Sequence, residues 1–238
     1  MGFRPRPGRC HPSGQIINLP VLKNLLIGGA LGSLLIAGCA SSPEAHQPIA
    51  ASAKQLAKEG FHPLFNGRDL SGWKLRRADG HPSWTVANGE LINTVNTGEH
   101  GTDLVTDANY WNFNVHYEYK IPPGANSGFY LRGRHEIQIF DDFKSGKPSL
   151  GGNGAIYQHT AVSQFASKPA GEWNTVDATM IGNKITVTLN GIKIHDSVEC
   201  NRATGSEIDG KVTEPGPFFL QGDHGSVTFS NLWVKELK

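Results

Sequence analysis

Residues 126–142 read NSGFYLRGRHEIQIFDD, and this stretch decides the fold. Apolar and polar residues alternate on both sides of Gly133, a pattern typical of two short strands joined by a tight turn. A three-residue loop over residues 133–135 gives a register in which the apolar side chains share one face. The facing pairs are then Phe129 with Ile139 and Leu131 with Ile137.

The opposite face of this predicted hairpin is polar. In the same register Arg132 lies opposite Glu136, and Tyr130 lies opposite Gln138. A two-residue loop would shift the pairing by one residue and place an apolar side chain next to Glu136. Each face of the hairpin would then carry both apolar and polar residues, and burying the polar ones would cost free energy. Two interpretations follow. The Arg–Glu pair is either a surface ion pair worth only ~0.2–1 kcal/mol, or part of a functional face.

The rest of the chain predicts further strands and tight turns. The pairs Asn88-Gly89 and Asn190-Gly191 suit hairpin turns, and residues 113–120 alternate cleanly between apolar and polar. Residues 172–196 indicate a three-stranded meander, and no helical periodicity is found after residue 60. About a dozen short strands favour an all-β protein with two antiparallel sheets face to face, a jelly-roll sandwich. We expect a ligand to bind on a concave outer face.

The first 38 residues read as an export signal. Four basic residues and no acidic residue precede the apolar run of residues 25–38. This run is too short for a permanent membrane helix. The tetrad IAGC ends at Cys39 and resembles a lipobox, so we expect lipidation of Cys39 and a bacterial cell-envelope location. An ordinary signal peptide is the alternative.

Residues 39–60 are rich in Ala, Ser and Pro and read as a flexible tether, with one folded domain over residues 61–238. Four of the 22 basic residues precede Cys39 and all 21 acidic ones follow it, which leaves the remainder with a formal charge of −3. With no basic run, nucleic acid is an unsuitable partner. Cys200 would lack a disulfide partner, and no structural zinc motif occurs.

Seven short motifs resemble, in order, the 3-keto-disaccharide (3-keto-glucoside) hydrolase domain family. They are LFNGRDLSGW, NSGFYLRG, EIQIFD, GAIYQ, GEWNT, LNG and LQGDHGSVTFSNLWVKEL, and the resemblance extends over residues 61–238. The resemblance implies a concanavalin A-like sandwich, an exported and often lipid-anchored protein, and action on glycosides oxidised at C3.

The resemblance also implies the site residues. Catalytic candidates are Glu136, His224 and Arg132, and candidates for substrate binding are Asn126, Tyr130, Gln138, Asp141, Tyr157 and Gln221. Gly222 and Asp223 separate Gln221 from His224, a wider spacing than is usual in the family.

A ketone at C3 acidifies the hydrogen at C2, so a base can remove it while the group at C1 departs by β-elimination and water then adds. Such chemistry needs a base, an electropositive group at the developing enolate and an acid. We predict Glu136 as the base, His224 as the acid or carbonyl partner, and Arg132, or a divalent cation in its place, at the enolate. An oxidoreductase would supply the 3-keto sugar.

Two rival functions remain open. In laminarinase-like hydrolysis two carboxylates act, and Glu136, Gln138 and Asp141 have the matching offsets, although glutamine cannot ionise. A non-catalytic sugar-binding module would instead use exposed aromatic rings such as Trp84, Trp111 and Trp173. Asp141, Asp142 and Asp223 are candidates for calcium, and the metal is left open.

Overall fold

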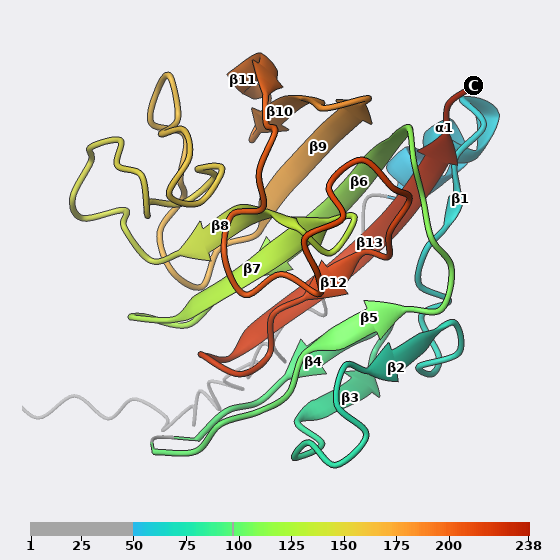
Figure 1. The fold of residues 1–238 in the computed structure, drawn as a ribbon. Helices are drawn as coiled ribbons and strands as arrows, with labels where there is room; N and C mark the ends of the chain where they lie inside the picture. The colour runs from blue at the N-terminus through green and yellow to red at the C-terminus, as the bar shows by residue number, and fades with distance from the viewer. Residues whose placement is uncertain (1–49, 97) are drawn as a thin grey trace, which may run out of the picture. The chain divides into compact units, whose positions relative to one another are not determined.

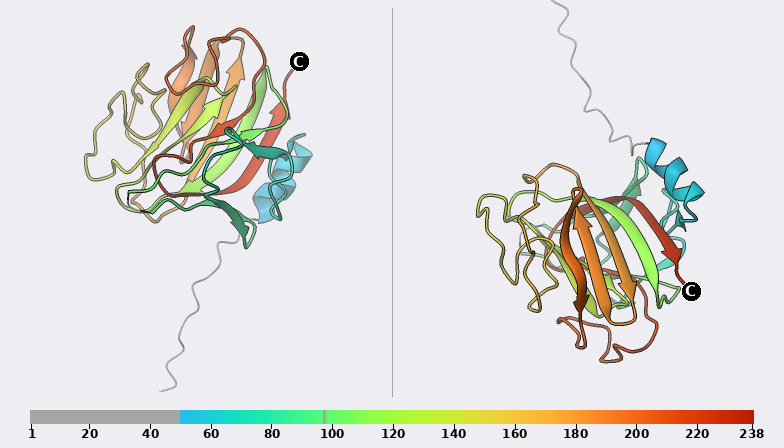
Figure 2. Two further views of the ribbon diagram at one scale, coloured as in Figure 1. Left: turned by 60° about the horizontal axis from the view of Figure 1, so that its bottom comes forward. Right: turned by 90° about the horizontal axis from the view of Figure 1, so that it is seen from above.

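The computed structural model describes residues 50–96 and 98–238, and almost all of its regular structure is β. Across this part of the chain, 13 strands form two antiparallel sheets, which confirms the predicted sandwich (Figure 1, Figure 2). The predicted signal sequence of residues 1–38, the lipidation residue Cys39 and the first part of the tether lie outside the described residues.

The larger sheet supplies the back of the sandwich in Figure 1. The hairpin turns predicted at Asn88-Gly89 and Asn190-Gly191 are confirmed, since all four residues have φ between 53° and 80°. The strand order is β11 (Ile192–Glu199), β10 (Lys184–Leu189), β9 (Asn174–Ile181), β6 (Phe113–Lys120), β13 (Val227–Glu236), β4 (Glu90–Asn93) and β3 (Trp84–Ala87), with β1 (His62–Pro63) pairing β13.

The smaller sheet contains the hairpin predicted for residues 126–142. Its inner face is apolar as predicted, because Phe129, Leu131, Ile137 and Ile139 are all at most 2% exposed. Its outer face carries the polar side chains. The strand order is β2 (Trp73–Leu75), β5 (Leu104–Thr106), β12 (Phe219–Leu220), β7 (Asn126–Leu131) and β8 (His135–Phe140).

Aromatic side chains from both sheets meet in the core. Tyr117 of β6 and Phe129 of β7 stack with ring centroids 4.0 Å apart, and Phe218 packs against Phe129 at 5.5 Å. Each such ring contributes about 1.5–3 kcal/mol by leaving water. Cys200 is buried and free. The sheets are therefore held by apolar packing, and the outer face of the smaller sheet is left to be covered by loops.

One part of the predicted tether is folded. Residues Ala50–Lys58 form helix α1, and Leu56 is only 8% exposed, so this part of the segment is helical. Its sequence consists mainly of Ala, Lys, Gln and Leu, which are good helix formers. Within residues 50–96 and 98–238, no helix has the length and hydrophobicity needed to cross a membrane.

Candidate active site

The β7–β8 hairpin sets the positions of the polar residues on the outer face. Tyr130 pairs with Glu136 and Leu131 with His135, so the loop is residues 132–134. The predicted pairing of Arg132 with Glu136 is wrong. Arg132 and Gly133 both adopt positive φ, 52° and 65°, which starts the turn one residue earlier than expected. The register shifts by two residues, and the faces are therefore preserved.

Glu136 lies at the centre of the polar group on this face. Its carboxylate accepts a hydrogen bond at Oε2 from the Tyr130 hydroxyl, at 2.8 Å. Gln138, with its amide oriented to satisfy both partners, donates to Glu136 Oε1 and to the Ser127 carbonyl, each at 2.9 Å. Both carboxylate oxygens thus have a fixed neighbour, and the side chain is held in one orientation.

Burial raises the pKa of Glu136 to about 7. The Tyr130 hydrogen bond and the charge of His224 lower this pKa, while Asp223 and Asp103 raise it. Burial and the adjacent Glu136 also raise the pKa of Tyr130, which keeps its phenol protonated as a donor. A carboxyl group with a pKa near neutrality is suited to general-base catalysis.

The absence of a side chain at Gly128 leaves room for the carboxylate of Glu136. A Cβ added at Gly128 would lie 2.3 Å from Glu136 Oε1, so the carboxylate occupies the space that any other residue would fill. The neighbouring Gln221 donates its backbone N–H to the Gly128 carbonyl at 2.9 Å. The side-chain oxygen of Gln221 is buried and has no hydrogen-bond partner among the described residues. It is therefore a buried acceptor that no described residue satisfies.

The loop between β11 and β12 covers much of this outer face (Figure 1). Ile208 packs on Tyr130 and Phe219, and the Thr204 hydroxyl accepts the Glu136 N–H at 2.8 Å. As a result Glu136 is only 3% exposed. We expected its carboxylate on an open concave surface, and that expectation is wrong because the loop and neighbouring side chains cover it.

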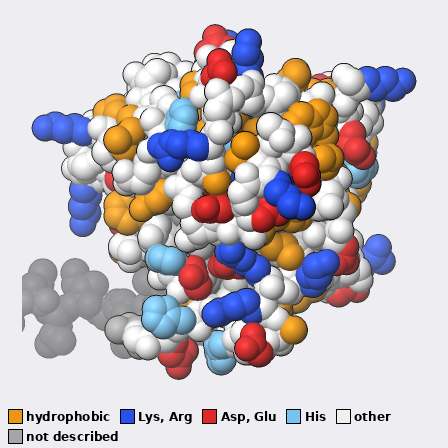
Figure 3. All heavy atoms as spheres, in the orientation of Figure 1, with side chains coloured by type: hydrophobic (Ala, Val, Ile, Leu, Met, Phe, Trp, Pro, Cys, Tyr) orange, Lys and Arg blue, Asp and Glu red, His pale blue; other side chains and the backbone are white. Residues whose placement is uncertain are grey.

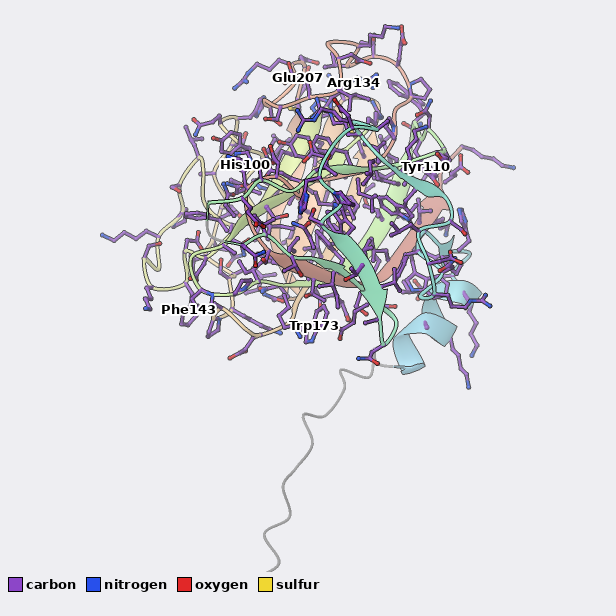
Figure 4. All side chains as sticks on the ribbon, turned by 90° about the horizontal axis from the view of Figure 1, so that it is seen from below. His100, Tyr110, Arg134, Phe143, Trp173 and Glu207 are labelled. Atoms are coloured by element: carbon purple, nitrogen blue, oxygen red, sulfur yellow. The ribbon has the colours of Figure 1, made fainter. Side chains whose placement is uncertain are left out.

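One ion pair and two side-chain hydrogen bonds to backbone carbonyls hold the covering loop in place. Arg134 binds Asp209 with an Nε–Oδ1 distance of 2.6 Å, and Figure 4 shows Arg134 beside Glu207 at one end of the sheet. Arg76 donates to the carbonyls of Ser206 and Glu207, at 2.7 and 2.8 Å. The middle of the loop is thereby fixed over the sheet.

A cavity of about 450 Å³ lies beside the Glu136 group. Asp103 and Asp223, which influence the pKa of Glu136, both belong to its wall. Acidic and basic side chains are interspersed over this face of the molecule (Figure 3). The residues that line the cavity are Arg76, Arg77, Thr102, Asp103, Ser206 and Asp223, none of which we predicted as a substrate contact.

His224 is exposed beside Asp223 of this cavity, and it lines a separate hollow of about 290 Å³. Its Nδ1 atom is 2.5 Å from Asp223 Oδ1, and the Asp223 carbonyl is 3.2 Å from Nδ1 of His100. The charge of His224 acts on Glu136. The carboxylate of Asp223 therefore orients the His224 imidazole.

The remaining predicted residues are distributed around this centre. The Tyr157 N–H donates to the Glu136 carbonyl at 3.0 Å, which places Tyr157 along the edge of β8. Asn126 begins β7, at the end remote from the turn, and pairs with Phe140. Asp141 accepts the Gly124 N–H at 2.8 Å and lines a different hollow of about 360 Å³. The structure thus brings Tyr130, Gln138, Gln221 and Tyr157 to Glu136 and places Asp141 elsewhere.

Arg132 is fully buried in the hairpin turn. Its guanidinium carbon is 3.6 Å from the centroid of the Trp111 ring, and its Nε donates to the Trp111 carbonyl at 2.8 Å. Burial and the nearby charge of Arg134 lower the pKa of Arg132 to about 10. Arg132 contacts Trp111 rather than Glu136, and we therefore assign it to the support of the turn.

The sequence left open whether a divalent cation binds this protein. Among residues 50–96 and 98–238, no three His, Cys, Asp or Glu side chains are grouped as a metal site requires. We therefore assign no described residue to a cation.

The raised pKa of Glu136 predicts a pH-dependent stability. The folded protein keeps this proton between about pH 4.5 and pH 7, where the unfolded chain has lost it, so the free energy of unfolding should fall across that window. Glu136→Gln removes the titration and should raise the free energy of unfolding by about 2–4 kcal/mol at pH 8. Urea denaturation at about pH 4 should show little difference, and an equal gain at both pH values would contradict the raised pKa.

The fold and this face define a class: a concanavalin-like β-sandwich with a partly covered polar site on the outer face of one sheet. A family model described as the 3-keto-alpha-glucoside-1,2-lyase-like domain matches residues 60–235, and the chain belongs to this family. The family predicted from the sequence motifs is thus confirmed.

Individual relatives agree with this assignment. A protein of Bacteroides thetaiotaomicron named 3-keto-disaccharide hydrolase is 29% identical in the matched region, and the match covers 49% of this chain and 51% of the relative. The chain therefore matches about half the length of that relative. A structure from Parabacteroides distasonis, described provisionally as a glycosyl hydrolase, superimposes with a TM-score of 0.65 and 26% identity, covering 78% of this chain and 97% of the other.

Proposed function

We propose that this protein cleaves glycosides that carry a ketone at C3 of the glucose ring. The observation that carries the proposal is the buried carboxyl of Glu136, with a pKa of about 7 and a hydrogen bond from Tyr130. Membership of the family and the name of the Bacteroides relative support the same substrate class.

The proposed reaction begins with Glu136 as general base. Its carboxylate removes the proton from C2, and the electron pair of the C–H bond forms an enolate with the C3 carbonyl. The enolate then expels the oxygen substituent at C1, which leaves as an alcohol after taking a proton. Water adds across the resulting C1–C2 double bond, so that one glycoside and one water give a 3-keto sugar and an alcohol.

Neighbouring residues have separate roles in this proposal. His224, oriented by Asp223, supplies the proton to the leaving oxygen. The free side-chain oxygen of Gln221 accepts a hydrogen bond from a sugar hydroxyl. Because Glu136 is covered, the proposal also requires the overlying side chains to give way when the sugar enters.

The two-carboxylate rival has less support. It needs a second carboxylate about 5–10 Å from Glu136, and the sequence offered Asp141 for that role. Asp141 instead caps the turn at Gly124. The charges of Asp103 and Asp223 also act on Glu136, and with burial they raise its pKa. Neither residue belongs to the strand motif from which the two-carboxylate function was predicted.

The binding-module alternative relied on exposed aromatic rings, and the three candidate tryptophans have other contacts. Trp84 is 6% exposed and donates to the Thr102 carbonyl, and Trp111 lies under Arg132. Trp173 is covered by the Lys120 ammonium at 4.7 Å. These contacts favour structural roles for the rings.

The pH dependence of turnover is a direct consequence of the proposal. Since the base must be ionised, kcat/KM should rise about tenfold per pH unit below pH 7 and level off above it. Initial rates on a 3-keto-glucoside between about pH 5 and pH 9 check this. A plateau that extends down to pH 5 would exclude a base with this raised pKa.

Substrate class is tested by incubating the full-length protein with a glucoside and with its 3-keto form, with and without a chelator. We expect release of the aglycone from the oxidised sugar alone. Release from the unoxidised glucoside would instead favour two-carboxylate hydrolysis, and loss of release with chelator would require a cation.

We also propose that the protein acts in the bacterial cell envelope, attached through lipidated Cys39, beside an oxidoreductase that makes the 3-keto sugar. The basic leader and the IAGC tetrad support the location. Mass spectrometry of the protein purified from its membranes would show a diacylglyceryl group on Cys39, and an unmodified Cys39 thiol would contradict the anchor.

A further inference from the structure

The covering loop between β11 and β12 is attached to the outer face of the smaller sheet at few points. We propose that residues 204–209 of this loop form a lid, which leaves the outer face to admit a sugar to Glu136. Ile208 is the contact of the lid with the sheet, and Asp209 is its latch. The inference rests on the proposed function for the identity of the ligand. It adds the segment that moves and the residues that control it.

The closed position of the lid leaves no room for a substrate at the proposed base. Glu136 is 3% exposed, and Gln138 and Gln221 beside it are each 5% exposed. The cavity of about 450 Å³ has Ser206 of the lid in its wall, whereas Glu136 does not line it. The Ser206 side chain also acts on the phenol of Tyr130, which donates to the Glu136 carboxylate. Ser206 therefore lies where the cavity meets the Tyr130–Glu136 pair.

The lid packs on a small hydrophobic cluster that is separate from the main core. Ile208 contacts the cluster of Val105, Tyr130 and Phe219 on the outer face, and none of these residues belongs to the apolar core between the sheets. Ile208 is itself only partly buried. Opening the lid therefore exposes one aliphatic side chain and leaves the main core intact, at a hydrophobic cost far below that of unfolding.

The latch consists of polar contacts with the β7–β8 turn. Asp209 binds Arg134 through two contacts, at 2.6 and 3.2 Å. The backbone N–H groups of Thr204 and Ile208 donate to the carbonyls of Arg134 and Gly133, at 3.0 and 2.9 Å. All of these contacts end on the turn or directly beside it. The lid can thus detach from the turn without breaking the hydrogen bonds that pair β7 with β8.

The lid has a glycine where its backbone changes direction. Gly205 has a φ of 123° and Ser206 a φ of 51°. Glycine adopts both signs of φ, so Gly205 is suited to absorb a rotation of the chain. A Cβ added there would meet its nearest neighbour, Tyr157 Cε1, at 3.9 Å, so the position is not tightly packed. We therefore place the hinge at Gly205, while Arg76 holds the other side by donating to the carbonyls of Ser206 and Glu207.

A reversible cross-link tests whether opening is required. A Cβ added at Gly133 would lie 2.9 and 3.2 Å from Cγ1 and Cγ2 of Ile208. Both of these atoms are bonded to the Ile208 Cβ, so the two Cβ atoms are at most about 4.5 Å apart, which a disulfide spans. Gly133→Cys/Ile208→Cys should pin the lid when oxidised and release it when reduced. Cysteine at the positive φ of Gly133 is strained equally in both forms, so their comparison cancels this strain.

The oxidised double variant should cleave a 3-keto-glucoside with a kcat/KM at least about tenfold below that of its reduced form, because the fraction of protein able to bind falls in proportion. A thiol reductant should restore the rate. Ile208→Cys alone, which retains the other cysteines of the full chain, is the matched control and should show no response to redox treatment. Equal kcat/KM values for the reduced form and for the oxidised form, with its cross-link confirmed by mass spectrometry, would overturn the lid.

Amide hydrogen exchange tests the lid without turnover and so separates it from the proposed function. Asp209→Ala removes the latch, and exchange of the Ile208 amide should quicken at least about tenfold, the effect expected for the loss of a hydrogen bond between charged groups. The amides of β7 should keep their rates. Glu214→Gln is the control, because it breaks an ion pair with Lys211 on the same loop whose two side chains are exposed.

An unchanged Ile208 amide in Asp209→Ala, or β7 amides that quicken as much as it does, would overturn the latch. If the wild-type protein released nothing from a 3-keto-glucoside while the lid amides responded as expected, the proposed function would fail and the latch would stand.

Discussion

Glu136→Gln is expected to lower kcat on a 3-keto-disaccharide by about 10²–10⁴-fold, the usual contribution of a positioned general base. The amide has nearly the shape of the carboxylate and can still accept the Tyr130 hydrogen bond, so the fold and the site geometry should persist. It cannot take a proton from C2. Calorimetric affinity for the substrate should therefore stay within a few-fold of wild type while turnover is lost.

The matched control is Glu172→Gln, at an exposed glutamate that lies outside the group around Glu136. It should have wild-type kinetics. Wild-type turnover in Glu136→Gln would rule out this carboxylate as the base, whatever other residues lie nearby.

Gly128→Ala should have the second-largest effect, although it adds only a methyl group. That carbon would lie 2.3 Å from Glu136 Oε1 and 3.0 Å from the carboxyl carbon, so the carboxylate must move. The Gly128 φ is outside the left-handed region, and alanine is therefore tolerated by the backbone. A displacement of about 1 Å at a reacting group can cost about 10²-fold, and we expect a loss of kcat of that order.

The expected loss of stability in Gly128→Ala is smaller, about 1–3 kcal/mol for overpacking in a well-packed region. Gly210→Ala is the control, since a Cβ there meets no atom within 4 Å and the backbone φ is not left-handed. Thermal denaturation and initial rates should show both effects in Gly128→Ala and neither in Gly210→Ala. Full activity in Gly128→Ala would mean that the position of the carboxylate is not critical.

Local patterns predicted the sandwich well because they are decided by neighbouring residues. Asn-Gly pairs tolerate positive φ, and they fix the β3–β4 and β10–β11 turns wherever the sheets lie. The sequence also predicted the polar face around Glu136 correctly, although the predicted pairing of β7 with β8 was wrong. A shift of two residues leaves every side chain on its original face, so Tyr130, Glu136 and Gln138 remain together.

The cavity could not be predicted in the same way, because its wall joins segments far apart in the sequence. Arg76 directly follows β2, and Asp103 directly precedes β5. Ser206 lies on a loop whose sequence has no periodic pattern. The burial of Glu136 depends on the same loop, and for that reason its raised pKa could not be read from the hairpin alone.

The fate of the hydrogen at C2 tests the central claim most directly. A 3-keto-glycoside labelled with deuterium at C2 is cleaved by the full-length protein in ordinary water, and the sugar product is analysed at early times by mass spectrometry. Spontaneous exchange is subtracted with labelled 3-keto-glucose incubated alone. Proton abstraction by Glu136 predicts that each cleaved sugar has lost its deuterium, whereas a product that retains the label would contradict the proposed elimination.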